Sequence, residues 1–435
     1  MNPEFKRYLW LELTAARLVV MPLLLGMLFY IIVSADNGDA SGYFALVAFV
    51  ILALAWGGKL SADSIIDEVE THTWDNQRMS SLPPWKMVWG KLFGSTVFAW
   101  YGGLFALLMF FYGNLGQMPV LQLTLLMVVA VLAAISFQAV GIITGLMSAR
   151  SKQRNRNLWL LVLLVLLFTT LAMPDFPATQ RELYSTRLWH GLEISHLNFI
   201  LASALSWCGW ALLGAYRMMR SEMQFRNGPF AWLLFLLWIT LYFSGFINAD
   251  SAEGTKRAVQ LAVVFIGIGG ITYILLLSEK MNLVELRKLL YQRSDKGDGI
   301  YLDLIPLWLL SLGFLLMLAV AAVVILIDEQ GMAQAILAAP IALCFILRDA
   351  AVILMLRLSP NNRRGALSAL IYLVVVYYIA NIFIEMTISN EFIAALFLPN
   401  MDGDWLSGLL PALIGAVSMI GVSGWRLYRP LFVRQ

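Results

Sequence analysis

The stretch DEVETHTWDNQRMSSLPPWKMVWGK, Asp67–Lys91, interrupts a chain that is otherwise apolar enough to lie in lipid. It contains acids, bases, two adjacent prolines and three tryptophans. The apolar runs on both sides of it are long enough to cross a membrane. The sequence therefore predicts a folded polar element between two membrane spans.

The composition of the whole chain indicates a membrane protein. Of its 435 residues, 60% are hydrophobic and 13% are charged, and the mean hydropathy is +0.77. A soluble domain carries about 25% charged residues. We expect an all-α, multi-pass integral membrane protein. The net charge is +3. The positive charges lie in short loops, where the positive-inside rule accounts for them, so nucleic acid is not an expected partner.

The apolar runs predict the number and orientation of the spans. Runs of about 17–25 apolar residues cover the hydrocarbon core of a bilayer, and the chain has twelve. They lie at 15–35, 43–66, 92–113, 119–148, 158–173, 197–215, 229–248, 258–278, 304–327, 331–358, 365–386 and 405–425. With the N-terminus inside, all but four of the 30 Lys and Arg residues fall on the inner side. The positive-inside rule then places both termini in the cytoplasm.

The connections between spans repeat in the same order in the two halves of the chain. Each half has a short outer loop, a long inner loop, a very short outer turn, a basic inner loop and a long outer segment. The long inner loops are 67–91 and 279–303, and the long outer segments are 174–196 and 387–404. This layout predicts two six-span halves, 1–222 and 223–435, related as parallel repeats in a pseudo-dimer.

The chain lacks the motifs of a nucleotide-driven motor or a metal enzyme. It has no G-x-x-x-x-G-K-[ST] loop, so we expect no nucleotide phosphates to bind to it. Its three histidines lie outside the predicted spans, and only two of them share a side. A closed zinc site needs four suitably spaced ligands. We expect neither a catalytic nor a metal site.

Charged residues within the predicted spans are few. Arg348 and Asp349 lie two to three turns inside the tenth span, and Glu385 lies near the outer end of the eleventh. Ionisable residues inside a membrane usually face a bundle interior or a wet cavity, which makes them functional candidates. The alternative is that Arg348 is a structural tie between helices.

The opening stretch has the pattern of a helix, a break and a second helix. Residues 67–74 continue the second span out of the membrane, and Pro83-Pro84 break the helix. A proline suits the first turn of a new helix, in which Trp85 and Trp89 share a face. Lys86 and Lys91 are expected to face the lipid headgroups. The alternative is an ordinary interfacial loop with an aromatic belt.

The N-terminal residues 3–14 predict a short amphipathic helix. Phe5, Leu9 and Leu13 follow one side of it, and Glu4 and Arg7 the other. Such a helix can lie flat among the headgroups before the first span. The alternative is a short tail that continues that span.

The residues of the opening stretch resemble a known pattern. The matches are Glu68 and Glu70, then Thr73-Trp74-Asp75, the turn Leu82-Pro83-Pro84-Trp85, and finally Gly90-Lys91. Together they are similar to the segment between the second and third spans of ABC-2 type transporter permeases, the transmembrane subunits of ATP-binding cassette exporters. His72 departs from the family, which usually has glycine before the threonine.

The resemblance implies two ABC-2-type bundles driven by separate cytoplasmic ABC ATPase subunits, two copies per permease chain. ATP and magnesium would bind to those subunits, and this chain would bind no cofactor. The region Met79–Trp85 would dock on the ATPase, and Asp67–Trp74 would transmit its motion. The second inner loop, 279–303, would also dock on the ATPase, with its tip at Ser294–Gly299. This role is inferred from the repeat alone. The candidate ATPase-coupling residues are Glu68, Glu70, Thr73, Trp74, Arg78, Leu82, Pro83, Pro84, Trp85, Lys91, Glu285 and Arg287.

The expected function is that of the permease subunit of an ATP-driven exporter in the bacterial inner membrane. Its cargo path would run between the halves, and its mostly apolar lining favours a lipidic or amphiphilic cargo. Membrane lipid is the other expected partner. The candidate path residues are Tyr30, Ser34, Arg348, Asp349, Tyr377, Asn381 and Glu385.

Two other classes remain open. A secondary active transporter also fits twelve spans in two halves, and it would need a coupling carboxylate in the membrane, for which only the pair Arg348–Asp349 is available. A membrane enzyme that modifies glycans or lipids would need a large outer loop. The one candidate is 174–196, which includes Arg181, Arg187, His190 and His196.

Overall fold

The computed structural model divides the chain into two compact units. One consists of 1–187 and 193–227, and the other of 188–192 and 228–435. The structure describes residues 2–35, 41–80, 82–151, 186–245, 253–279, 305–327, 333–358, 365–379, 391–400 and 404–432. The main division, between Asn227 and Gly228, lies a few residues after the end of the first predicted half.

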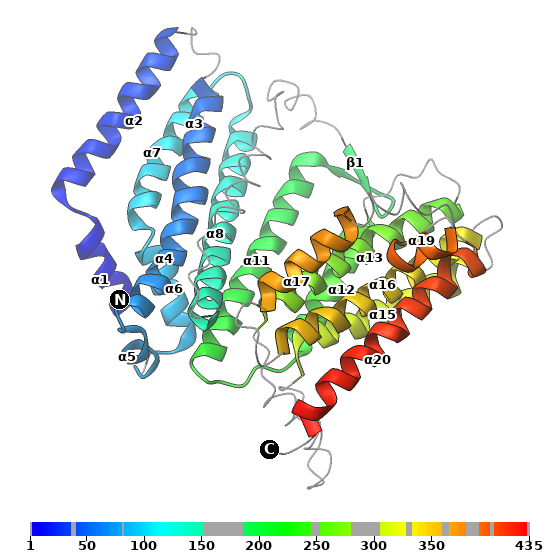
Figure 1. Ribbon diagram of the computed structural model, residues 1–435. Coiled ribbons are helices and arrows are strands. Elements are labelled where there is room, and N and C mark those ends of the chain that lie inside the picture. Colours follow the sequence, from blue (N-terminus) through cyan, green and yellow to red (C-terminus); the bar gives the residue numbers. More distant parts are fainter. Residues whose placement is uncertain are drawn as a thin grey trace. The chain divides into compact units, whose positions relative to one another are not determined.

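The first unit is a bundle of helices (Figure 1). Helix α8 packs closely against both α4 and α11, and α7 packs against α3. In chain order the helices are α1 (Pro3–Glu12), α2 (Ala15–Ala35), α3 (Ser41–Phe49), the π-helix η1 (Val50–Trp56), α4 (Gly57–Glu70), α5 (Trp74–Arg78), α6 (Pro84–Gly94), α7 (Val97–Gly113), α8 (Val120–Ser151) and α11 (His196–Glu222).

The second unit is also helical. Its largest apolar core joins α12, α13, α15 and α16, and a smaller one joins α16 to η4 and α20. The helices are α12 (Phe230–Ser244), α13 (Glu253–Ser278), α15 (Leu307–Leu326), α16 (Ala333–Leu358), α17 (Gly365–Val374), η3 (Val375–Ile379), α19 (Glu391–Phe397), η4 (Trp405–Leu409) and α20 (Leu410–Phe432).

A small β-hairpin departs from the all-α expectation. Strands β1 (Thr186–Trp189) and β2 (Leu192–Ser195) pair within the segment that was predicted to be a long outer connection. The two turn residues, His190 and Gly191, have φ angles of 49° and 80°. Positive φ at both central residues is typical of the type I′ turn that suits a two-residue hairpin.

The helices confirm a multi-pass membrane protein. Within the described residues, eight helices are long and apolar enough to span a membrane, or nine if the bent pair α6–α7 is one span. Two further apolar helices, at Phe230–Ser244 and Leu367–Ile379, are shorter than the spans expected there. The predicted span 158–173 lies outside the described residues. A total of twelve spans and cytoplasmic termini stay predictions.

The third predicted span is not one straight helix. Helices α6 and α7 meet at an angle of 55° at a break beside Ser95 and Thr96. The Ser95 hydroxyl donates to the carbonyl of Lys91 at 2.6 Å, and the Thr96 hydroxyl donates to that of Leu92. Hydroxyls that bond the carbonyl four residues earlier bend helices. Two of them in succession account for the bend.

A π-helix in the second span is stabilised by a buried amide. Gln138 of α8 is fully buried and donates from Nε2 to the carbonyl of Ala53 in η1, at 2.9 Å. Its Oε1 accepts a hydrogen bond from the indole of Trp100 at 3.0 Å. A π-helix disturbs the regular pattern of backbone hydrogen bonds. The Gln138 side chain, which the sequence did not single out, supplies a partner for a carbonyl there.

Candidate functional site at the elbow

The elbow, residues 67–94, has the predicted pattern of helix, break and helix. Helix α4 ends at Glu70, and Trp74 begins the separate short helix α5. The expectation that the second span runs on to Trp74 is therefore wrong. Helix α6 begins with Pro84 in its first turn after Pro83 at the N-cap, as predicted. The rings of Trp85 and Trp89 meet edge to face, 5.7 Å apart, which confirms their shared face.

The end of α4 is a tight turn centred on His72. The N–H of Thr73 donates to the carbonyl of Glu68, and the N–H of His72 donates to that of Val69, at 2.9 and 3.2 Å. This is the Schellman pattern, whose residue after the C-cap adopts left-handed dihedral angles and is usually glycine. His72 stands in that place with a φ of 57°. The turn thus has the geometry that glycine favours at the position where the sequence departs from the family pattern.

Replacing His72 with glycine will therefore stabilise the first unit. A left-handed residue with a Cβ costs about 1–2 kcal/mol, which glycine avoids. Against this stands the extra freedom of glycine in the unfolded chain, so we expect a net gain of up to about 1 kcal/mol. The thermal unfolding midpoint in mild detergent should rise for His72→Gly and not for His72→Ala, which keeps the Cβ. Equal midpoints for the two variants would contradict a strained turn.

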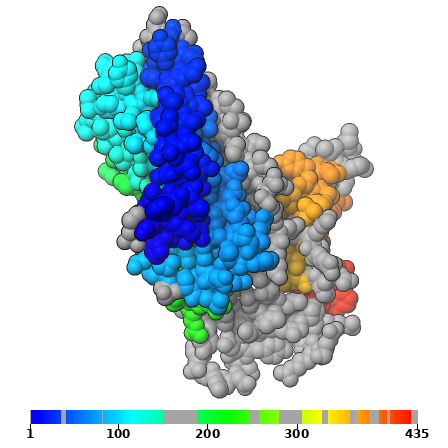
Figure 2. Space-filling view, turned by 90° about the vertical axis from the view of Figure 1, so that its left-hand side faces the viewer, coloured from blue at the N-terminus to red at the C-terminus, as the bar shows by residue number. Residues whose placement is uncertain are grey.

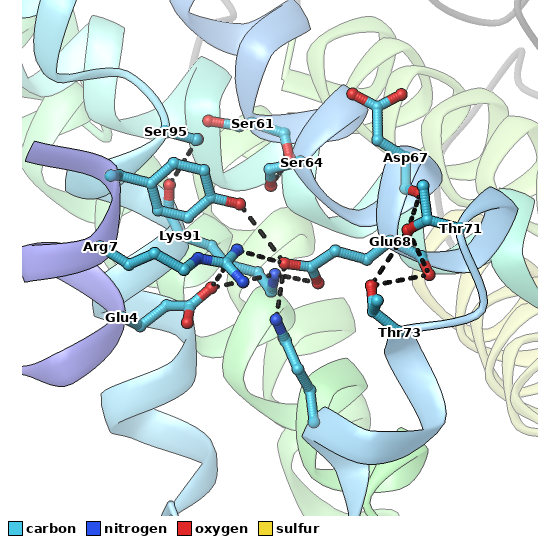
Figure 3. A network of polar contacts seen from close by, with 12 residues as sticks. Glu4, Arg7, Ser61, Ser64, Asp67, Glu68, Thr71, Thr73, Lys91 and Ser95 are labelled. Carbon is cyan, nitrogen blue, oxygen red and sulfur yellow. Dashed lines mark hydrogen bonds and ion pairs between the residues drawn. The ribbon is translucent and has the colours of Figure 1, made fainter. Parts of the chain in front are cut away.

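The buried Glu68 carboxylate is the centre of a polar network (Figure 3). Its Oε1 accepts hydrogen bonds from Arg7 Nη2 at 2.6 Å and from Gln77 Nε2 at 2.7 Å. Its Oε2 forms an ion pair with Nζ of Lys91. The network therefore connects four helices, since Arg7 lies in α1, Glu68 in α4, Gln77 in α5 and Lys91 in α6.

Lys91 does not face lipid headgroups, and that prediction is wrong. Its side chain is fully buried, paired with Glu68 and 3.6 Å from Oε1 of Glu4. Its Nζ also lies 5.5 Å from the centre of the Trp74 ring, within range of a cation–π contact. Lys86 is exposed, and that it faces lipid headgroups stays a prediction. A buried ammonium needs charged partners, and these come from helices that are distant in sequence.

Helix α1 is confirmed, but its polar side is part of the elbow. Glu4, expected on the polar side of the helix, is buried against α6, and its Oε1 lies 3.0 Å from Arg7 Nη2. The Asn2 side chain caps α1 at the N–H of Glu4 and donates to the carbonyl of Lys86. Figure 2 shows α1 and α2 as one continuous strip on the surface of the first unit. The polar side of α1 therefore fixes it to α4 and α6.

The environment of Glu68 keeps two neighbouring groups of α1, Arg7 and Tyr8, protonated. Burial raises the pKa of the Tyr8 hydroxyl, and the nearby negative charge of Glu68 raises it further. Burial lowers the pKa of Arg7, but the hydrogen bond and the charges from the neighbouring acids outweigh it, so its pKa rises. Arg7 therefore keeps its positive charge beside Glu68, and Tyr8 keeps its proton.

The tip of the elbow presents apolar side chains to the surroundings. Met79 is 78% exposed just after α5, and Trp85 is 40% exposed at the start of α6. The Trp85 ring is supported by Tyr216 of α11, 5.6 Å away. Arg78, behind the tip, donates from Nε to the carbonyl of Glu222 at 2.9 Å. The elbow is thus a fixed structure with an exposed apolar tip.

The remaining coupling candidates divide into three groups. Thr73 and Leu82 are structural: the Thr73 hydroxyl donates to the carbonyl of Glu68 at 3.3 Å, and Leu82 packs on the core beneath the elbow. Glu70 is exposed at the last residue of α4. Glu285 and Arg287 lie outside the described residues, as do the path candidates Asn381 and Glu385.

A second polar cluster surrounds Asp349 in the second unit. The fully buried carboxylate accepts hydrogen bonds from the hydroxyls of Tyr273, Tyr372 and Tyr377 at 2.7, 3.1 and 2.6 Å. It also accepts one from Nε of Arg348 at 3.0 Å. A carboxylate has about four lone-pair sites, so Asp349 is saturated. Of the path candidates, the structure brings Arg348, Asp349 and Tyr377 together.

The other two described path candidates lie in the first unit. Tyr30 and Ser34 are both exposed on α2. Little of α2 is buried, and it touches mainly α7 and α3. Sequence reasoning missed Tyr273 and Tyr372, although tyrosines within predicted spans near an acid are a usable signal.

In the second unit, too, an acid joins two helices, α13 and α15, between which the predicted inner loop lies. Glu279, the residue directly after α13, accepts hydrogen bonds from the backbone N–H groups of Leu307 and Trp308, at 3.2 and 3.3 Å. These are the first residues of α15, and free N–H groups at a helix N-terminus favour a carboxylate. In the first unit Glu68, near the end of α4, binds Lys91 in the last turn of α6, so only Glu279 binds the start of a helix.

No protein-family model, curated protein or solved structure matches the chain. In the part of the chain that the structure describes, no three His, Cys, Asp or Glu side chains gather as metal ligands.

Proposed function

We propose that the chain is the permease subunit of an ATP-driven transporter, an exporter in the bacterial inner membrane. The observation that carries the proposal is the elbow, which is held by buried ion pairs and exposes Met79 and Trp85 at its tip. An exposed apolar tip on a helix–break–helix element has the form of a part that fits a groove on a partner protein. The missing G-x-x-x-x-G-K-[ST] loop favours an ATPase as that partner.

The network supports transmission of force as well as docking. A push on the tip reaches α4 through Gln77 and α6 through Lys91, because both bind Glu68. The same carboxylate connects to α1 through Arg7. The four helices are therefore joined at one point, and ATPase subunits that bind the two transport states differently can drive such an element. His72, in the conformation that favours glycine, adds support to the family resemblance.

Saturation of Asp349 weighs against a secondary transporter. A coupling carboxylate must gain and lose a proton or an ion in each cycle. Asp349 instead accepts four hydrogen bonds and neighbours a permanently charged guanidinium. Of the outer segment 174–196, which the rival enzyme class would need, the described part is a short hairpin followed by the first residue of α11. The ATP-driven permease is the better-supported class.

The test is whether the neighbouring reading frame encodes a protein with a G-x-x-x-x-G-K-[ST] loop and whether the chain captures it. The tagged chain in mild detergent should retain that protein, and Met79→Asp should weaken retention by at least about tenfold, as expected for a central contact of an interface. Met79 is so exposed that its replacement should leave the unfolding midpoint unchanged. Leu192→Asp, at an exposed apolar residue of the hairpin, is the matched control. Equal retention by the parent and Met79→Asp would reject the docking surface, and no retention by the parent would reject the partner.

A further inference from the structure

The second span changes its helical hydrogen bonding part-way along. Residues Val50–Trp56 form the π-helix η1 between α3 and α4. In an α-helix the N–H of Gly57 would donate to the carbonyl of Ala53, four residues earlier. It donates instead to the carbonyls of the residues before and after Ala53. The side-chain amide of Gln138 donates to the Ala53 carbonyl, at 2.9 Å.

This change displaces α4 around the helix axis. A π-turn takes one residue more than an α-turn, and one residue of an α-helix is a rotation of about 100°. Phe49 is fully buried just before η1, and in an unbroken α-helix Asp67, eighteen residues later, would lie on the same side after five turns. Glu68 is buried there instead, and Asp67 is exposed.

Two earlier turns of α4 show the same displacement. An unbroken helix would bring Leu60 and Asp63, eleven and fourteen residues along, to the side of Phe49. Ser61 and Ser64 are buried instead, whereas the other two are partly exposed. Three successive turns thus agree on a shift of one residue, which arises before them, in η1.

The contacts of α4 would also suit the unshifted register. Gly58 lies against α8, and Glu68 lies beside Lys91. In the unshifted register the residues before them, Gly57 and Asp67, would take these two places. Glycine would replace glycine and an acid would replace an acid. These contacts therefore do not choose between the two registers.

Gln138 is placed to make that choice. It is fully buried in α8, binds the middle of η1 at Ala53, and accepts a hydrogen bond at Oε1 from Trp100 of α7, at 3.0 Å. A single buried polar side chain can fix the register of packed helices. If η1 relaxed to an α-helix, the N–H of Gly57 would return to the Ala53 carbonyl, and Gln138 would have to compete for it.

We propose that Gln138 is a positioning residue: by holding η1 in its π form it sets the register of α4, so that Glu68 rather than Asp67 meets Lys91 at the elbow. It acts through the 14 residues of α4. This goes beyond the proposed function, because it concerns how the elbow is placed whichever partner drives the protein.

The first test deletes one residue from η1. Deletion of Ile51, which is 57% exposed, removes the extra residue, so the span can continue as an α-helix with both buried sides in place. The purified chain in mild detergent should keep an unfolding midpoint close to that of the parent. Deletion of Leu104, a 55% exposed residue in the middle of α7, is the matched control. It should lower the midpoint strongly, because it turns half of a regular helix by about 100°. If the two deletions are equally damaging, η1 is not a register shift.

The second test asks whether Gln138 acts through η1. The two native cysteines, Cys208 and Cys344, are replaced with alanine, and Ile65→Cys places a thiol on the fully buried side of α4. Gln138→Leu should raise the rate at which N-ethylmaleimide labels this thiol by about tenfold or more, because α4 then leaves its register. In the chain that lacks Ile51 the same substitution should leave the rate unchanged, since no π-helix remains to be held.

Two controls separate a change of register from a general loosening. Ala106→Cys, fully buried in α7, reports opening of the bundle and should keep its slow rate in Gln138→Leu. Trp100→Phe removes the indole donor but keeps the bond from Gln138 to η1, so Ile65→Cys should react as in the parent. An unchanged rate at Ile65→Cys in Gln138→Leu would overturn the proposal. An equal rise at Ala106→Cys, or the same rise with and without Ile51, would also overturn it, since Gln138 would then be a packing residue of the whole bundle.

Discussion

Replacing Glu68 with methionine will destabilise the first unit by about 3–5 kcal/mol, the usual cost of removing one partner from a buried ion pair. The reason is Lys91, which is fully buried and would keep only the more distant Glu4 as a counter-charge, 3.6 Å away. The thermal unfolding midpoint of the purified chain in mild detergent should therefore fall strongly. Asp67→Asn changes the exposed acid one residue earlier and should leave the midpoint unchanged.

The opposite substitution should cost less. In Lys91→Met, Glu68 still accepts hydrogen bonds from Arg7 and Gln77, so its charge remains compensated. The double variant Glu68→Met/Lys91→Met leaves no unpaired buried ammonium, and apolar replacement of a whole buried pair is often neutral or stabilising. We expect both to unfold at higher temperatures than Glu68→Met alone. A double variant as unstable as Glu68→Met would show that the ion pair is not the reason for its loss.

The local architecture of the elbow could be predicted from its residues. Proline restricts its own backbone and that of the preceding residue, so Pro83-Pro84 marks a break and a restart in any context. Two tryptophans four residues apart must share a helix face. These signals act within one turn of chain, and the structure agrees with both.

The buried charges could not be predicted in this way. Lys91 and Glu68 are 23 residues apart, and Arg7 and Glu68 are 61 apart. Near the end of a span, a lysine that faces headgroups and one that is buried in an ion pair look the same in sequence. The difference depends on how α1, α4 and α6 pack. Nothing in the pattern of any one helix encodes that packing.

The cluster around Asp349 was predictable only in part. Arg348 and Asp349 stand out as charges in an apolar run, but their tyrosine partners come from α13, α17 and η3. In a regular α-helix, Tyr372 and Tyr377 would point about 140° apart. The change to π-helical hydrogen bonding at Val375–Ile379 alters that angle, and both hydroxyls reach one carboxylate. No pattern in this sequence predicts the π-helix.

Glu279 lies at the start of the second predicted inner loop, as Glu68 lies near the start of the first. Glu68 binds a side chain of α6, whereas Glu279 binds the free N–H groups of α15. Both the partners and their places differ, because Lys91 lies in the last turn of α6, whereas the N–H groups belong to the first turn of α15. The second half thus lacks the Thr-Trp-Asp and Pro-Pro elements of the first, yet it retains an acid at the corresponding place. The two contacts do not share a geometry, and the internal repeat stays a prediction.

The close packing of α4 on α8 leads to a second large effect. A Cβ on Gly141 would lie 2.3 Å from the carbonyl oxygen of Gly58, and one on Gly145 would lie 2.8 Å from that of Ala62. Small residues four apart let helices approach closely in membranes. A backbone atom cannot move aside as a flexible side chain can, so Gly141→Ala must push the helices apart. We expect a cost of about 1–3 kcal/mol, and more for Gly141→Leu.

The matched control is another helical glycine of the same unit. A Cβ on Gly209 in α11 or on Gly26 in α2 would meet nothing within 4 Å. Alanine forms helices better than glycine by about 1 kcal/mol, so Gly209→Ala and Gly26→Ala should leave the unfolding midpoint unchanged or raise it. The same replacement of glycine by alanine should therefore lower the stability at Gly141 and preserve or raise it at Gly209. If Gly141→Ala unfolds at the same temperature as Gly209→Ala, α4 and α8 are not packed as closely as their glycines indicate.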